Sequence, residues 1–240
     1  MNVVVLTTET PHHAYFVSRL KESFGEVTAF CETREATIAS NTNHPFERKR
    51  ESYEWNRWFN GRATTVSELV PTQQFYSMNE PEALEALSRA NPDVIIVFGT
   101  GILKIPVIEF CPNKIFNLHG GDPEYYRGLD THLWAVYHRE FNALIATLHQ
   151  LDEKVDAGNI VLQGAIPLHC GMKLYHLRAA NTEICTRLTE SAIEMIKRHG
   201  NVTSRRQSRR GRNYSAIPLE LMRLCQERFD EHISRYQCGE

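Results

Sequence analysis

Length, composition and charge set the first limits on this chain. It has 240 residues, 42% of them hydrophobic, and a formal net charge of −2 at pH 7. A chain of this size can bury one good core, which favours one domain with an appendage over two full domains. The small net charge argues against general nucleic-acid binding. The six cysteines are scattered, and neither a signal peptide nor a membrane-spanning run is seen, so we expect a reducing, cytoplasmic setting.

The chain opens with a strand followed by a helix. Residues 3–6 form a continuous apolar run, which is typical of a buried parallel strand. Thr10 and Pro11 form the start signal of a helix, and apolar residues recur at helical spacing as far as Phe24. Residues 27–30 and 74–76 indicate further strands, and residues 81–90 a further helix.

Two early groups of side chains could bind an anionic ligand. The first turn of the first helix lies beside a strand end, where unpaired backbone N–H groups favour an anion. It carries His12, His13 and Tyr15. A second helix is expected from His44 onward, on the surface of the sheet, and its cations could hold a pyrophosphate. These are Arg48, Lys49 and Arg50. Exposed histidines without a role and a solvated charged face are the respective alternatives.

Residues 93–99 give the clearest central strand, and glycines follow it. Gly99 and Gly101 stand at its carboxyl end, where an open α/β sheet binds ligands and where missing side chains admit a flat ligand to the backbone. A simple turn is the alternative.

Three polar residues further along form a coherent set for acyl transfer. Asn117 and His119 follow an apolar run, and Asp156 lies on a loop expected between strands at 143–151 and 160–167. Histidine titrates near pH 6.5, a carboxylate can orient it, and an amide can donate to a developing oxyanion. A satisfied turn is the alternative for the Asn-x-His pair.

In this region the sequence resembles the folate-dependent formyltransferases built on the glycinamide ribonucleotide transformylase fold. The shared motifs are Asn117, His119, Pro123, Tyr126-Arg127-Gly128 and Asp156-Ala157-Gly158. The resemblance implies a Rossmann-like α/β fold, with an open, mainly parallel sheet and helices on both faces. It also implies a catalytic trio of Asn117, His119 and Asp156, with 10-formyltetrahydrofolate as formyl donor, an amine as acceptor and no metal. One departure is Gly120-Gly121-Asp122, where the family usually has a Ser between His and Pro, and we expect it to loosen that loop.

The resemblance also implies where ligands bind. The pterin would be received by backbone groups of the loop after the central strand, and the folate candidates are Gly101, Ile102, Leu103 and Asp152. The first turn lacks the Gly- and Ser-rich phosphate loop of the purine enzyme and looks like the branch that formylates nucleotide-linked amino sugars. We therefore expect a GDP- or dTDP-linked 4-amino-4,6-dideoxy sugar such as perosamine, used for surface polysaccharide or O-antigen. Its candidate contacts are the two early groups with Tyr126 and Arg127. Glycinamide ribonucleotide formylation, formyltetrahydrofolate hydrolysis and a non-catalytic nucleotide-sugar-binding module are the alternatives.

The last part of the chain changes character. A long helix is expected over residues 173–198, followed by an arginine-rich stretch to residue 212 and a last amphipathic helix over 219–236. We expect a catalytic domain over residues 1–200 and an extension over 201–240. Because about 40 residues rarely fold alone, the extension should pack on the main domain or on another subunit of a homodimer. An RNA-binding role for residues 205–212 is the alternative.

Overall fold

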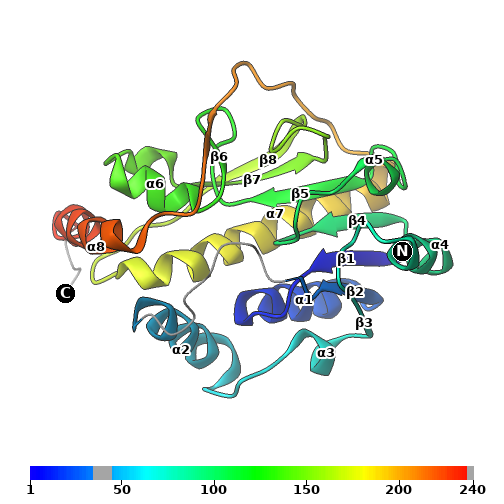
Figure 1. Ribbon diagram of the computed structural model, residues 1–240, viewed down its shortest axis with the longest axis horizontal. Coiled ribbons are helices and arrows are strands. Elements are labelled where there is room, and N and C mark those ends of the chain that lie inside the picture. Colours follow the sequence, from blue (N-terminus) through cyan, green and yellow to red (C-terminus); the bar gives the residue numbers. More distant parts are fainter. Residues whose placement is uncertain (35–44, 237–240) are drawn as a thin grey trace.

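A seven-stranded sheet forms the centre of the molecule (Figure 1). The computed structural model describes residues 1–34 and 45–236. The strands, in sheet order, are β3 Thr72–Phe75, β2 Val27–Glu32, β1 Val3–Thr7, β4 Val94–Val97, β5 Ile115–His119, β7 Ile145–Gln150 and β8 Ile160–Ala165. The first five run parallel, whereas β7 is antiparallel to both β5 and β8. The predicted open, mainly parallel α/β sheet is confirmed.

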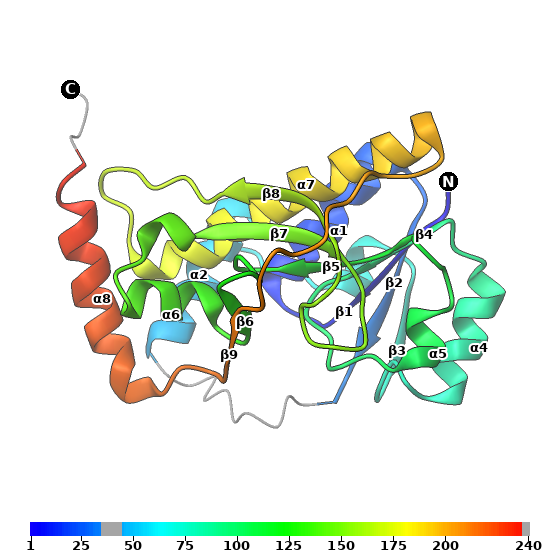
Figure 2. The same ribbon diagram turned by 90° about the horizontal axis from the view of Figure 1, so that it is seen from above.

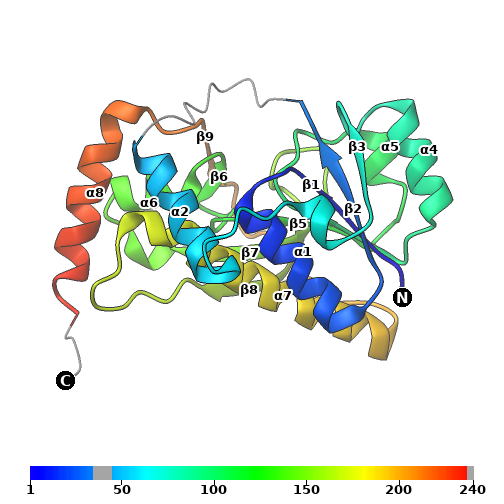
Figure 3. The ribbon, with the colours of Figure 1, turned by 90° about the horizontal axis from the view of Figure 1, so that it is seen from below.

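Alternation along β1 shows how the sheet is covered on both faces. Val3 and Val5 belong to a core shared with α1 Pro11–Phe24 and α7 Leu177–His199. Val4 and Leu6 point to the other face and join a core with α4 Pro81–Ala90 and α5 Ile105–Ile108. Figures 2 and 3 show these two helix pairs on opposite sides of the strands. A strand buried on both faces has no polar side to show, which explains its continuous apolar sequence.

A further core lies beyond the end of the sheet. It joins α6 Thr131–Tyr137, α8 Leu219–Ile233, and the short helices η1 Phe141–Ala143 and η2 Leu174–His176. The chain after α7 therefore packs on earlier segments: α8 lies against α6, and β9 Arg212–Tyr214 pairs in parallel with β6 Tyr126–Gly128. The expected division at residue 200 stays a prediction. No helix within the described ranges is both long and apolar enough to span a bilayer.

Several predicted elements differ in position or contacts. The second helix is α2 Pro45–Phe59, and it packs on α1 and η2 instead of on the sheet as expected; His44 lies outside the described residues. The remaining short helix is α3 Val66–Leu69. The Tyr126-Arg127-Gly128 turn is a strand, because it finds a partner in β9, far away in sequence. The last helix ends at Ile233, three residues early.

Candidate active site

Asn117 and His119 lie on one face of β5. Phe116 and Leu118 point to the other face of the sheet, into the core formed with α1 and α7. In the antiparallel pairing with β7, Asn117 stands opposite His149 and His119 opposite Thr147. Directly opposed residues in such a pair share a face, so four polar side chains gather at one place on the sheet.

The loop between β7 and β8 brings Asp156 to these residues. One carboxylate oxygen, Oδ2, lies 3.4 Å from His119 Nδ1 and accepts a hydrogen bond of 2.8 Å from the Gly128 backbone N–H. The other, Oδ1, accepts at 3.4 Å from Asn117 Nδ2. Asp156 has φ +50°, a left-handed conformation that Asp tolerates better than most residues. The structure thus gathers the three residues that the sequence singled out.

His119 is neutral at rest. Its Nε2 lies 2.8 Å from the Tyr126 carbonyl oxygen, which can only accept, so Nε2 carries the proton. Burial lowers the pKa of His119 below its ordinary value, although the neighbouring Asp156 opposes that shift. The lone pair therefore sits on Nδ1 and faces Asp156. The buried site therefore favours His119 as a base that takes up a proton during the reaction.

Asp156 stays ionised beside this neutral ring. Burial alone would raise the pKa of its carboxyl group. The hydrogen bond from the Gly128 N–H and the attraction to His119 or His149, whenever either imidazole is protonated, hold that pKa well below its usual range. A proton added at His119 Nδ1 would therefore meet a carboxylate at 3.4 Å.

His149 is a site residue that the sequence did not single out. Its Nδ1 lies 2.7 Å from the Gln150 carbonyl oxygen and donates to it, which leaves Nε2 as an acceptor for Asn117 Nδ2 at 3.1 Å. The His149 side chain is only 1% exposed. Its hydrogen bond therefore fixes the amide of Asn117 away from solvent. The alternation of Ala146, Thr147, Leu148 and His149 is the signal that could have revealed it.

The loop after β5 is firmly held, contrary to the expectation that its glycines loosen it. The carbonyl oxygens of Gly120 and Gly121 each accept a hydrogen bond of 2.7 Å, from the Thr131 and Thr147 hydroxyls respectively. A Cβ on Gly121 would lie 2.9 Å from His119 Nε2. The glycine is required because the loop backbone approaches the imidazole closely.

Tyr126 and Arg127, expected to contact the acceptor, have structural partners. The Tyr126 hydroxyl donates to Glu140 at 2.8 Å, and its ring stacks on Tyr214. Arg127 is 4% exposed and donates from Nε to the Pro123 carbonyl at 2.8 Å. Through these contacts both side chains stabilise the segment around β6.

The three predicted residues in the first turn of α1 lie in two different places: His12 and His13 are together, and Tyr15 is apart from them. His13 is 3% exposed, and its ring would lie within 2.5 Å of a Cβ on Gly99. The His12 ring lies beside it, tilted by 41° with ring centroids 3.9 Å apart, and neither ring is exposed as the alternative required. Burial lowers the pKa of both imidazoles. Tyr15 instead stacks on Trp58 and lines a separate pocket with Arg57 and Glu183, so the structure does not bring it to the trio.

The three cationic residues of α2 differ in exposure. Arg48 and Lys49 are exposed. Arg50 turns inward and pairs with Glu47, and burial lowers its pKa to about 10. A nearby buried pair, missed in the sequence, joins Arg178 and Glu54 through two hydrogen bonds of 2.7 and 2.6 Å. The guanidinium groups of Arg50 and Arg178 thus have carboxylate partners.

A polar wall formed by His132 and Asn181 lies next to Gly120. A Cβ on Gly120 would lie 3.3 Å from His132 Nδ1 and 3.4 Å from Asn181 Nδ2. Asn181 is 4% exposed, and its Oδ1 has no hydrogen-bond partner. Burial lowers the pKa of His132 to about 4, so its imidazole is neutral. The wall is polar but carries no net charge of its own.

The folate candidates are only partly suited to the roles expected for them. The Gly101 N–H lies 3.3 Å from Glu32 Oε2, and the Ile102 carbonyl accepts from Asn79 at 2.9 Å. Ile102 is 69% exposed, whereas Leu103 is 6% exposed and packs in the core. Leu103 therefore cannot offer its side chain to a ligand, and Asp152 is exposed on the loop that carries Asp156.

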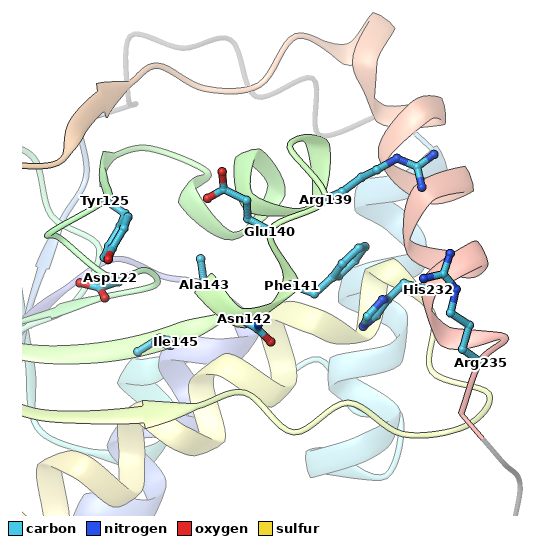
Figure 4. A pocket seen from close by; sticks show the side chains of 10 residues that line it. All are labelled: Asp122, Tyr125, Arg139, Glu140, Phe141, Asn142, Ala143, Ile145, His232 and Arg235. Atoms are coloured by element: carbon cyan, nitrogen blue, oxygen red, sulfur yellow. The ribbon is translucent and has the colours of Figure 1, made fainter.

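A larger pocket lies apart from these residues, between the end of α6 and α8 (Figure 4). Its volume is about 860 Å³. The lining includes Phe141 stacked flat on His232, with Arg139 and Arg235 beside them. Neither Asn117, His119 nor Asp156 lines this pocket.

Comparisons with known proteins identify the family of the chain. A family model described as "Formyl transferase" matches residues 1–183. A methionyl-tRNA formyltransferase from Syntrophus aciditrophicus is 32% identical over 108 residues, which is 45% of this chain and 34% of that protein. The chain thus spans about a third of that relative.

Two solved structures share the fold. A 4-N formyltransferase from Francisella tularensis has a TM-score of 0.58 at 16% identity, covering 90% of this chain and 76% of that one. The formyltransferase PseJ from Anoxybacillus kamchatkensis, in complex with UDP-4,6-dideoxy-4-formamido-L-AltNAc and tetrahydrofolate, has a TM-score of 0.55 at 17% identity, covering 93% and 89%. With the family model matching well over half of its length, the chain belongs to the formyl transferase family.

Proposed function

We propose that this protein transfers a formyl group from 10-formyltetrahydrofolate to the amine of a nucleotide-linked amino sugar. The observation that carries the transfer is the arrangement around His119. A neutral imidazole presents its lone pair to an ionised carboxylate at 3.4 Å, and a primary amide lies 3.4 Å from the same carboxylate. This set can accept a proton, stabilise the resulting cation and donate to an oxyanion.

Each residue has a defined part in the reaction. The donor, when bound, supplies the formyl carbon, which the acceptor amine attacks to give a tetrahedral centre with a negatively charged oxygen. One N–H of Asn117 is held by His149 at 3.1 Å, whereas the other reaches Asp156 only at 3.4 Å. The second N–H is the one free to turn to the oxyanion. Losing one such donor typically costs about 10²–10³ in turnover.

Proton movement falls to His119 and Asp156. As the new carbon–nitrogen bond forms, the amine becomes acidic, and His119 Nδ1 can take its proton, directly or through water. Asp156 then pairs with the imidazolium. When the bond to N10 of the folate breaks, the same proton can be returned to the leaving nitrogen, so that His119 ends neutral.

The folate site is proposed on the loop after β4 and the loop of Asp152. The loop after β4 lies at the carboxyl edge of the parallel strands, where open α/β folds bind ligands. The loop of Asp152 starts at the other edge, because β7 is antiparallel and its last residue, Gln150, pairs with Phe116 near the start of β5. Gly101 fits that role, because its missing side chain leaves its backbone open to a flat ring and the nearest atoms to a Cβ there belong to the side chains of Glu32 and Arg34.

The choice of an amino sugar rests on the wall beside Gly120. Hydroxyl and amide groups of a sugar match the neutral His132 and the unpartnered Oδ1 of Asn181. Arg50 and Arg178 are already paired with carboxylates, which leaves them poorly suited to a phosphate in the same place. The PseJ complex holds a formamido sugar on a nucleotide, a product of this class.

A parallel assay of three acceptors tests the proposal. The full chain is incubated with formyl-labelled 10-formyltetrahydrofolate and either a dTDP- or GDP-linked 4-amino-4,6-dideoxy sugar, glycinamide ribonucleotide or methionyl-tRNA. Labelled product from the sugar nucleotide alone is expected. Product from either of the other two, with none from the sugar, would overturn the choice of acceptor. Release of labelled formate without any acceptor would indicate hydrolysis, and binding of the sugar without turnover would indicate a non-catalytic module.

A further inference from the structure

The chain between α7 and α8 crosses the candidate active site. Figure 2 shows this segment returning over β8 and β7 toward β6, on the side of the sheet where the loop of Asp156 lies. Residues 204–212, here called the strap, are fixed at both ends. Arg205 exchanges two backbone hydrogen bonds of 2.8 Å with Ile160, and β9 begins its pairing with β6 at Arg212.

Two arginines of the strap, Arg205 and Arg209, contact the loop after β5. Arg205 donates to Glu124 at 2.8 Å, and the hydroxyl of Ser208 donates to the same carboxylate at 2.7 Å. Glu124 is 7% exposed, and these donors, Arg205 foremost, lower its pKa to about 2. Arg209 lies over the ring of Tyr125 at 3.9 Å. Arg205, Ser208 and Arg209 thus fasten the strap to the loop after β5.

Gln207 is the strap residue that reaches the loop of Asp156. Its amide nitrogen Nε2 donates to the backbone carbonyls of Asp156 and Gly158, both at 2.8 Å. Its oxygen Oε1 accepts from Arg127 Nη2, and Arg127 continues to the Pro123 carbonyl. One amide group therefore links the loop of Asp156 to the loop that follows His119.

We infer that Gln207 is a positioning residue for the carboxylate of Asp156. This rests on the proposed function, in which Asp156 stabilises the protonated His119. A left-handed conformation at a residue other than glycine costs free energy and persists only where its surroundings hold it. The two hydrogen bonds from Gln207 hold the carbonyl oxygen of Asp156 and the carbonyl oxygen of Gly158, two residues later. Without them the loop can relax, and the carboxylate leaves its 3.4 Å contact with His119.

Two variants separate this role from simple stability. Gln207→Glu keeps the acceptor for Arg127 but places a carboxylate against the two loop carbonyls, so the contacts to the loop are lost. The added negative charge would by itself raise the pKa of His119, so a shift of the titration to lower pH reports the movement of Asp156. Arg206→Ala is the matched control, because Arg206 is an exposed neighbour on the same strap. Formyl transfer, hydrogen exchange of backbone amides in residues 154–158, and NMR titration of His119 are measured in all three proteins.

For Gln207→Glu we expect kcat to fall 10- to 100-fold while KM for both substrates changes less than threefold. Exchange in the loop should be at least tenfold faster, and the His119 titration should move to lower pH because Asp156 no longer favours the imidazolium. Unchanged loop exchange and an unchanged titration would overturn the inference, as would a kcat loss equal to that of Arg206→Ala. If the wild-type protein transfers no formyl group, the proposed function fails, and the His119 titration alone then decides whether Gln207 positions Asp156.

Discussion

Replacing Asp156 by Asn tests the central pair of the proposed mechanism. Asparagine has nearly the same volume and also tolerates the left-handed φ of +50° at this position, and its side-chain oxygen can still accept from the Gly128 N–H. The substitution therefore removes the negative charge and, with it, only the long 3.4 Å contact that Asn117 Nδ2 makes to Oδ1. Alanine would be a poorer choice, because it would add backbone strain to the loss of charge.

The size of the effect follows from the distance between the charges. At 3.4 Å, an imidazolium and a carboxylate attract each other by about 5 kcal/mol with an effective dielectric constant of about 20. This corresponds to at most about 10³ to 10⁴ in rate, since about 1.4 kcal/mol is tenfold. The dipole of the new amide recovers part of that attraction. We therefore expect kcat for Asp156→Asn to fall about 10²- to 10³-fold.

The assay is labelled formyl transfer at saturating donor and acceptor, with unfolding temperature measured in parallel. Glu153→Gln is the control, because it removes an exposed carboxylate from the same loop. The pH profile adds a second test: Asp156 raises the pKa of His119, so its loss should move the acid limb of kcat to still lower pH. A kcat loss below tenfold in a folded variant, or an acid limb that does not move, would refute the reasoning.

Three further predictions concern other parts of the site. His149→Phe keeps the ring but removes the acceptor of Asn117 Nδ2, so kcat should fall 10- to 100-fold with the folate KM little changed; a normal kcat would contradict the anchoring role. Gly101→Val should raise the folate KM at least tenfold without loss of stability, since the nearest atoms belong to the movable side chains of Glu32 and Arg34, and unchanged folate binding would place the donor elsewhere. Burial lowers the pKa of His13 to about 3, so the unfolded chain binds a proton near pH 6.5 that the folded chain refuses, and stability should fall as pH drops. Urea unfolding at pH 7 and pH 5 should show a loss of about 2 kcal/mol from this residue, and His13→Asn should show a correspondingly smaller loss, whereas equal losses would contradict it.

Local sequence patterns predicted the sheet well, because its central strands are buried on both faces. Residues 3–6 and 94–97 can only be strands covered by helices on both sides, and the structure has them as β1 and β4. The gathering of Asn117, His119 and Asp156 was expected from motif order. Loops held by a rigid sheet can meet, and here the β5–β7 register places the two strand residues under the β7–β8 loop.

Contacts between distant segments could not be read in the same way. The pairing of β6 with β9 joins residues about 86 positions apart, and nothing in Tyr126-Arg127-Gly128 indicates that a partner strand exists. The same limit applies to Arg178 and Glu54, whose buried pair joins α7 to α2. The burial of Leu103 could not be read from the sequence either, because an apolar side chain in a loop can lie in the core below it or face solvent; its expected backbone contact with the folate stays a prediction.

The two halves of the candidate site differ in what holds them, and this affects how they respond to mutation. Asn117 and His119 are fixed by strand pairing and by buried neighbours on both sides, so only changes in contact with them should disturb them. Asp156 depends on a loop whose carbonyls are bound by the strap, about 50 residues later in the chain. Substitution of the strap residue that binds these carbonyls should therefore lower kcat through Asp156, while the amide of Asn117, held by His149, keeps its place. Loss of rate without loss of binding would mark the loop-held half of the site.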